Sequence, residues 1–199
     1  MTPPEIAHLR AALAAPGSGS SDFDLNPDAA PPRGRVLKSA GVLVALQPGR
    51  VGLDVILTKR ATTLKHHPGQ IAFPGGRQDP GDTGPTDAAL REAEEEIGLP
   101  RTRPEILGLL PTHETVTTYL VTPVVALIDG AFDETPEPGE VSEIFRVPLA
   151  HIADPANYRI EGRLWRGTRR AYYVVPYGPY YIWGATARIL HTLADRLTP

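Results

Sequence analysis

The chain has 199 residues, 41% of them hydrophobic, and its 20 Lys and Arg nearly balance its 23 Asp and Glu, so that the formal net charge is −3. This length and composition suit a single domain with a buried core and exclude a wholly disordered chain. The balance argues against a generic nucleic-acid or membrane binder, which carries a basic excess, and the absence of cysteine excludes disulfides and a thiolate metal site or nucleophile.

Neither export nor membrane insertion is indicated by the sequence. No apolar run approaches the ~20 residues of a membrane span. The N-terminus lacks the basic-then-apolar pattern of a signal peptide. We therefore expect a cytoplasmic protein with no nucleic-acid or membrane partner.

The first part of the chain is predicted to be a short helix followed by a flexible linker. Apolar residues recur at helical spacing within residues 4–15, namely Ile6, Leu9 and Leu13. Residues 16–34 are rich in Gly, Ser, Pro and Asp, which is typical of a loop with little core of its own. We therefore expect residues 1–34 to precede an organised domain at residues 35–199.

Strands and a long connection are predicted next. Residues 36–46 and 52–58 are apolar and rich in β-branched side chains, and the turn at residues 48–50 between them indicates a hairpin. Residues 59–84 contain many Gly and Pro and are predicted to form a long connection. Loops of that length inside a compact domain are often functional.

The clearest helix is predicted over residues 85–98. Pro85 suits the first helical turn, while Gly98 and Pro100 suit its end. The remaining elements are predicted in this order: strands at 106–110 and 116–128, a turn region at 129–139, a small helix from 147–152, a hairpin at 158–175 around Gly167, and a helix at 183–197. This mixture of strands and helices favours a layered α/β (α+β) domain.

Charge is distributed unevenly along the chain. Residues 79–96 contain seven acids and one base, a local net charge of −6, so the rest of the chain carries +3. At 100° per residue, one side of the predicted helix is covered by apolar residues, namely Ala89, Leu90, Ala93 and Ile97. Three carboxylates project from another side within about one turn of each other: Glu92, Glu95 and Glu96.

Such a carboxylate cluster suits Mg²⁺ or Mn²⁺, which prefer hard oxygen ligands. The alternative is the solvated acidic face of a surface helix, because Glu is a good helix former and common on surfaces. The run Phe73-Pro74-Gly75-Gly76 leads toward the helix. Paired glycines let the backbone approach a ligand closely, which favours a ligand site.

Gly76, Asp82 and the run from Arg91 to Leu99 resemble the Nudix box. That box reads Gly, five residues, Glu, seven residues, then Arg-Glu-aliphatic-x-Glu-Glu-x-Gly-aliphatic. Here Asp82 stands for the early Glu, eight residues separate it from Arg91, and Ala93 fills the aliphatic position.

The resemblance implies an α/β/α sandwich with a mixed sheet. It also implies hydrolysis of a small-molecule substrate, a nucleoside diphosphate linked to another group, with Mg²⁺ or Mn²⁺. By the same match, Glu92, Glu95 and Glu96 would be metal ligands. The carbonyl of Gly76 would add another ligand, and Arg91 would orient a carboxylate.

The segment before the box resembles the coenzyme A pyrophosphatase branch of that family. Arg60, Ala61, Gly69 and Phe73–Gly76 match its pattern, and Lys65 replaces a second Arg. The resemblance implies coenzyme A as substrate and 4′-phosphopantetheine and adenosine 3′,5′-bisphosphate as products. The residues expected to bind the substrate are Arg60, Lys65, Gly69, Gln70, Phe73, Gly75, Gly76 and Arg77.

Hydrolysis needs a base or a metal-bound hydroxide. Glu95, Glu140 and Glu143 are the candidate bases, with Glu114 as a further option, and each could equally be an ordinary surface acid. The tyrosines near the C-terminus could stack on adenine or simply pack. His66 and His67 are expected to be exposed to solvent.

Other functions stay open. The chain could hydrolyse another nucleoside diphosphate derivative, such as ADP-ribose or a dNTP, or it could be a non-catalytic nucleotide-binding module. It contains no Gly-x-Ser-x-Gly elbow and no P-loop. The oligomeric state, monomer or homodimer, is also left open.

Overall fold

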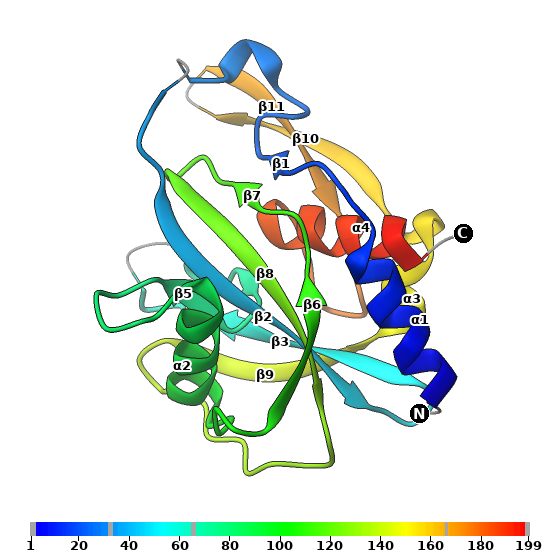
Figure 1. Cartoon of the computed structure of the whole chain (residues 1–199). Helices are drawn as coiled ribbons and strands as arrows, with labels where there is room; N and C mark the ends of the chain where they lie inside the picture. The colour runs from blue at the N-terminus through cyan, green and yellow to red at the C-terminus, as the bar shows by residue number, and fades with distance from the viewer. Residues whose placement is uncertain (1–2, 32–33, 65–66, 166, 198–199) are drawn as a thin grey trace.

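A computed structural model gives the fold and describes residues 3–31, 34–64, 67–165 and 167–197. A large mixed sheet lies between α2 (Pro85–Ile97) on one face and the other helices on the opposite face (Figure 1). This is the α/β/α sandwich that the resemblance implied. Because each face of the sheet is apolar, both faces need a helical layer to cover them.

Two long strands form the centre of the sheet. Strand β2 (Lys38–Pro48) pairs in parallel with β8 (Tyr119–Ile128) and antiparallel with β3 (Leu53–Arg60). The β2–β3 hairpin confirms the sequence prediction. The other strands of this sheet are β1 (Ser20–Ser21), β4 (Ile71–Ala72), β5 (Gly75–Arg77), β6 (Pro104–Leu109), β7 (His113–Glu114) and β9 (Val141–Pro148).

Five of these strands were not predicted, of which β1 and β7 have two residues each. Strands β4 and β5 lie inside the segment 59–84, which was expected to be a long connection, and both are very short. Strand β9 pairs along the whole of β3, although its sequence contains charged residues. Short or mixed segments become strands only when a neighbouring strand supplies hydrogen bonds, and single-sequence patterns do not contain that information.

Helix α2 packs closely on the sheet through small and apolar residues. Ala89, Ala93 and Ile97 are buried against Leu43 and its neighbours on β2, β3 and β8. A Cβ atom at Gly41 of β2 would overlap the backbone carbonyl of Pro85. The first turn of the helix therefore lies directly on the strand, at the residue of β2 that pairs with Gly76 of β5.

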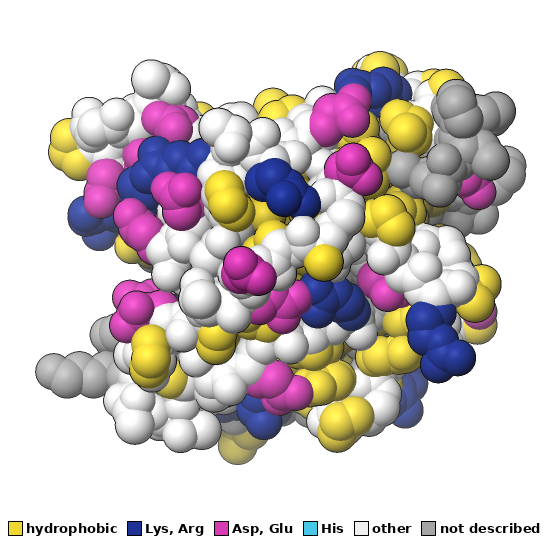
Figure 2. All heavy atoms as spheres, turned by 90° about the horizontal axis from the view of Figure 1, so that it is seen from below, with side chains coloured by type: hydrophobic (Ala, Val, Ile, Leu, Met, Phe, Trp, Pro, Cys, Tyr) yellow, Lys and Arg dark blue, Asp and Glu magenta, His cyan; other side chains and the backbone are white. Residues whose placement is uncertain are grey.

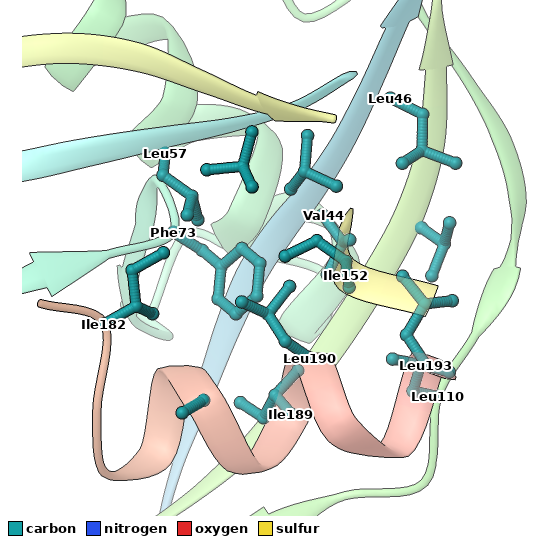
Figure 3. Close-up of a cluster of buried hydrophobic side chains, with 14 of the residues drawn as sticks. Val44, Leu46, Leu57, Phe73, Leu110, Ile152, Ile182, Ile189, Leu190 and Leu193 are labelled. Atoms are coloured by element: carbon teal, nitrogen blue, oxygen red, sulfur yellow. The ribbon is translucent and has the colours of Figure 1, made fainter. Parts of the chain in front are cut away.

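The opposite face is covered by α1 (Pro3–Ala14), α3 (Leu149–Ala153) and α4 (Ala185–Leu197). In Figure 3, Leu190 and Leu193 of α4 point toward the sheet and Phe73 lies within the same cluster. Helix α4 confirms the last predicted helix. The apolar stripe of α4 packs into the larger of the two hydrophobic cores.

The N-terminal segment differs from the expected flexible linker. Leu13 of α1 belongs to the main core, and Phe23 is buried. Strand β1 pairs in parallel with β7, and a 3₁₀ turn η1 (Pro27–Ala29) follows it. The buried His113 ring binds the Ser20 hydroxyl and the Asp22 carboxylate. These contacts attach the segment to the sheet. They could not be predicted from its polar composition, which is typical of a loop.

The predicted C-terminal hairpin is present as a second, two-stranded sheet. It consists of β10 (Arg159–Trp165) and β11 (Thr168–Val174), after the 3₁₀ turn η2 (Pro155–Asn157). No helix in the described part of the chain is both long and apolar enough to cross a membrane. On the face shown in Figure 2, acidic and basic side chains are interspersed, and neither sign forms a continuous surface there.

Candidate active site

The site is built where β5 passes over α2. Gly76 pairs with Gly41 of β2, which fixes β5 beside the helix. A Cβ atom at Gly76 would overlap the carboxylate of Glu92, and Gly75 has a φ of +148°, which side chains rarely tolerate. Glycine at both positions therefore lets the backbone lie directly against the acidic side chains of the helix.

Glu96 is the most buried carboxylate of the site. Its side chain accepts a hydrogen bond of 3.0 Å from the Gly75 N–H, and the residue is only 5% exposed. The helical angle placed Glu96 with Glu92 and Glu95 on a side away from the apolar residues, and the alternative was a solvated acidic face. Strand β5 covers this side of α2 at Glu96. Burial raises the pKa of Glu96 to about 8, with a further increase from the charges of Glu92 and Glu140.

Glu92 and Glu95 lie nearer the surface. Burial also raises the pKa of Glu92, and the Arg91 guanidinium partly offsets this while Glu95 and Glu140 add to it. The side chain of Glu95 is 55% exposed. The charges of Glu95 and Glu140 therefore act on Glu92, and those of Glu92 and Glu140 act on Glu96.

Arg91 holds this acidic region together. Its Nε and Nη2 atoms donate to the two oxygens of Asp82 at 3.0 and 3.1 Å, and Nη1 donates to Glu95 at 2.9 Å. Nη1 also lies 3.1 Å from Glu92, and Nη2 donates to the carbonyl of Arg77. The sequence pattern left Asp82 without a secure role. The fold places it as the bidentate partner of Arg91, which lowers the pKa of Asp82.

The donor set fits a divalent cation by its chemistry. Glu92 and Glu96 have raised pKa values because they are buried acids that repel each other, and a bound cation would relieve both effects. Their oxygens and the nearby backbone of Gly76 are ligands of the kind that Mg²⁺ and Mn²⁺ prefer. Among the described residues, however, no three His, Asp or Glu side chains form a ready-made metal cluster.

The match of the NUDIX domain pattern to residues 37–165, well over half of the chain, decides the family. The chain belongs to the Nudix family. A relative from Photorhabdus laumondii, named "Uncharacterized Nudix hydrolase NudL", is 40% identical over 143 residues, which cover 72% of this chain and 76% of the relative. The protein of the same name from Escherichia coli K12 is 38% identical over 79% of this chain and 81% of its own length.

Solved structures agree on the fold. The NUDIX domain of Shewanella oneidensis NrtR, solved in complex with ADP-ribose, aligns over the full length of both chains with a TM-score of 0.54 at 16% identity. A MutT/Nudix family protein from Enterococcus faecalis aligns over 99% of this chain and 74% of its own, with a TM-score of 0.51 at 15% identity. These two structures show the fold alone, and it is the family match together with the relatives at 38–40% identity that makes this chain a Nudix hydrolase of nucleoside diphosphate derivatives. Nudix hydrolases generally use divalent ions such as Mg²⁺ or Mn²⁺.

The candidate bases of this Nudix site lie in different surroundings. Glu140 is exposed, and its charge raises the pKa values of Glu92 and Glu96. Glu143 accepts a hydrogen bond of 2.5 Å from the Tyr180 hydroxyl. Glu114 forms an ion pair with Arg35 at 2.5 Å. Glu95 and Glu140 are therefore the acids that act directly on the cluster.

The residues expected to bind the substrate also lie in different surroundings. The charge of Arg60 lowers the pKa of Glu96, and the N–H of the next residue, Ala61, donates to the carbonyl of Glu140 at 2.8 Å, so the end of β3 lies near the acidic residues. Arg77 is exposed and pairs with Asp79 at 2.7 Å, so it is held at the edge of the site. Lys65 and His66 lie outside the described residues.

The turn that follows Arg60 returns the chain to β3. The Arg60 carbonyl accepts from the N–H of Gly69, and its N–H donates to the Gln70 carbonyl at 2.9 Å. Phe73 is 4% exposed and lies within the core. Its side chain was expected to bind the substrate, and that contact stays a prediction. The ring packs in the main core two residues before Gly75.

Tyr180 is a site neighbour that the sequence did not single out individually. Its ring stacks on Phe145 with centroids 3.6 Å apart, and its hydroxyl holds Glu143. The tyrosine-rich composition near the C-terminus was the only signal for it. The sequence alone could not show which of these rings faces β9.

Proposed function

We propose that this Nudix hydrolase cleaves the diphosphate of coenzyme A or its derivatives, giving 4′-phosphopantetheine and adenosine 3′,5′-bisphosphate. The observation that carries the proposal is the position of the two ends of the segment 60–76 in the fold. This segment resembles the coenzyme A branch, and its two ends meet at the acidic cluster, with Arg60 acting on Glu96 and Gly76 lying against Glu92. The positively charged side chain of Arg60 and the carboxylates that suit a metal ion thus lie near each other. A substrate with several phosphates requires both kinds of group.

In this proposal Glu92, Glu95 and Glu96 hold Mg²⁺ or Mn²⁺, with the Gly76 carbonyl as a further ligand. When bound, the metal neutralises phosphoryl charge and acidifies water. Arg91, fixed by Asp82, orients the carboxylates of Glu92 and Glu95. These contacts reduce the freedom of the ligands before the substrate arrives.

The remaining residues have binding and proton-transfer roles in the proposal. Arg60 and Arg77 provide positive charge for the phosphates, and Lys65 would add to it. Glu95 or Glu140 accepts the proton of the attacking water. Glu143, whose carboxylate is hydrogen-bonded to Tyr180, is less free to act as the base.

The test is a substrate panel with the purified protein and Mg²⁺ or Mn²⁺. We expect coenzyme A to give a higher kcat/KM than ADP-ribose, NADH or dNTPs. The Glu96→Gln variant should lose about 100-fold or more of this activity, because it removes a charged metal ligand. The matched control is Glu94→Gln on the same helix, whose carboxylate pairs with Arg101 instead, and it should remain active.

Each contrary result has a distinct meaning. If ADP-ribose or a dNTP ranks first, the coenzyme A assignment is wrong while the hydrolase assignment stands. If Glu96→Gln turns over every substrate as fast as the unchanged protein, the metal site is assigned wrongly. A folded protein that binds nucleotides and hydrolyses none of them would be a binding module.

A further inference from the structure

We propose that this chain forms a two-fold symmetric homodimer through the outer edge of β10. In this dimer two copies of β10 run antiparallel, with Gly162 opposite Gly162 of the second copy. The two β10–β11 hairpins thereby join into one four-stranded antiparallel sheet. The hairpin lies at the end of the molecule away from α2 (Figure 1), so this surface is separate from the candidate active site.

The pairing inside the hairpin shows which backbone groups face outward. Gly162 is opposite Ala171, and Ile160 is opposite Tyr173. The backbone N–H and C=O of Ala171 both bond to the Asn26 side chain, at 2.8 and 2.9 Å, and the Tyr173 carbonyl accepts from Gly184. Ala171 and Tyr173 therefore direct their backbone groups away from β10.

In an antiparallel ladder, opposite residues either exchange both hydrogen bonds or exchange none. Because Ala171 and Tyr173 point outward, their partners Gly162 and Ile160 also point outward, from the other edge of the hairpin. Leu164 follows the same alternation. In the part of the chain that the structure describes, the outward groups of these three β10 residues have no hydrogen-bond partner.

The side chains on this edge also favour a partner. Ile160 is 58% exposed and Leu164 is 74% exposed, both on the same face of the hairpin. An edge strand with free backbone groups and exposed apolar side chains is a template for pairing with another strand. Other edge positions of the hairpin are already covered, because Asn26 and Gly184 occupy the outer side of β11.

The sequence of β10 complements itself. When a second copy is reversed about Gly162, Ile160 faces Leu164 of that copy and Glu161 faces Arg163 of that copy. The outward backbone groups then meet in hydrogen-bonded pairs, and an apolar pair and an opposite-charge pair occur on each side of the two-fold axis. Cross-strand pairs of both kinds stabilise a sheet.

The neighbouring registers are disfavoured by charge. A slip by two residues in one direction places Glu161 opposite Glu161 of the second copy, and a slip in the other direction places Arg163 opposite Arg163. Like charges directly opposite each other are destabilising. The charge pattern therefore selects the Gly162-centred register, and it favours a second copy of this chain over a strand of unrelated sequence.

The experiment measures mass as a function of concentration, by sedimentation velocity or light scattering, from about 5 to about 500 µM, because a single strand pair predicts a weak dimer. We expect the unchanged protein to convert from monomer to dimer over this range. Glu161→Arg and Arg163→Glu should each weaken the dimer at least about tenfold, because each places like charges opposite each other.

Two further samples distinguish the proposed register from a general loss of folding. An equimolar mixture of Glu161→Arg and Arg163→Glu should form a heterodimer, and the double variant Glu161→Arg/Arg163→Glu should form a homodimer again. Ile160→Lys should weaken the dimer. Its matched control, Val51→Lys at an exposed apolar position in the β2–β3 turn, should not.

Several outcomes would overturn the proposal. A protein that stays monomeric at the highest concentration has no such interface. A dimer that survives both single charge reversals uses another surface. Failure of the two single variants to associate when mixed, while each retains the circular dichroism and hydrolase activity of the unchanged protein, also rejects the β10 pairing.

Discussion

Glu96 illustrates how its surroundings change the chemistry of a single side chain. Its spacing from Glu92 and Glu95 predicted a shared role as a metal ligand, with a solvated surface position as the alternative. Strand β5 buries it and supplies the Gly75 N–H as its hydrogen-bond donor. The resulting rise in pKa to about 8 means that, without a cation, the proton is favoured at neutral pH.

The buried state of Glu96 predicts a pH-dependent stability for the metal-free protein. Because the folded pKa, about 8, exceeds the usual value of 4.5, the folded state binds the proton more tightly than the unfolded state. The free energy of unfolding should therefore fall as the pH rises from about 4.5 to about 8, by on the order of 5 kcal/mol. Urea unfolding in EDTA at several pH values measures this slope.

Glu96→Gln is the control for that slope, because Gln keeps the hydrogen-bond acceptor and does not titrate. The variant should show a flatter dependence than the unchanged protein over the same range. Added Mn²⁺ should restore stability at the alkaline end for the unchanged protein by neutralising the carboxylates. An identical slope in both proteins would contradict the assignment to Glu96.

At the scale of elements, the site is organised by the interaction between the loop that contains Asp82 and helix α2. The sequence has one residue more between Asp82 and Arg91 than the family pattern. In the turn before α2 the Asp79 N–H donates to Asp82 at 2.7 Å. Asp82 still reaches Arg91, and Arg91 contacts two acids of the helix. A residue outside the helix thus fixes the arginine of the helix that contacts Glu92 and Glu95.

Asp82→Asn should lower kcat/KM by about 10- to 100-fold, because the guanidinium of Arg91 loses its bidentate partner and no longer fixes Glu92 and Glu95. Asp82→Glu, which restores the residue type of the family pattern, should retain most of the activity. Steady-state kinetics across a range of Mg²⁺ concentrations measures both variants.

Asp87→Asn is the matched control beside the same turn, because its carboxylate accepts from the Thr83 N–H at 3.1 Å and lies 3.7 Å from Arg101. It should change kcat/KM by less than about threefold. An equal loss in the Asp87 and Asp82 variants would show that the turn as a whole matters, and that the bidentate pair has no special role.

At the scale of the whole molecule, the N-terminal segment is part of the packing. Helix α1 places Leu9 and Leu13 in the same core as α4. Arg196 of α4 donates to backbone carbonyls at the end of α1, including that of Ala15 at 2.7 Å. The segment was expected to precede an independent domain, yet its apolar side chains help to cover one face of the sheet.

Leu13→Ala should lower the free energy of unfolding by about 2–4 kcal/mol, because it opens a cavity beside Gly108 in the core. The exposed position next to it provides the control, since Ala14→Ser should change stability by less than about 0.5 kcal/mol. Urea titrations of the three proteins measure the difference. Equal stability of Leu13→Ala and the unchanged protein would mean that the domain is stable without α1.

Local patterns in the sequence were enough to predict the β2–β3 hairpin, helices α2 and α4, the β10–β11 hairpin and the set of acidic residues on α2. Each depends on residues close together in the chain, such as the β-branched runs or the Pro85 and Gly98 limits of the helix. The family resemblance added the α/β/α arrangement, which the structure confirms.

Only the tertiary structure decided the burial of Glu96, the pairing of Asp82 with Arg91, the existence of β5 and β9, and the docking of the N-terminal segment. Each of these depends on a partner that is distant in sequence or on a neighbouring strand. The charges of the chain show the same division between what the sequence and what the tertiary structure determine. The net charge of −3 and the acidic stretch came from the sequence, whereas burial beside β5 decided which of those acids carry a raised pKa, because desolvation depends on what covers a side chain in space.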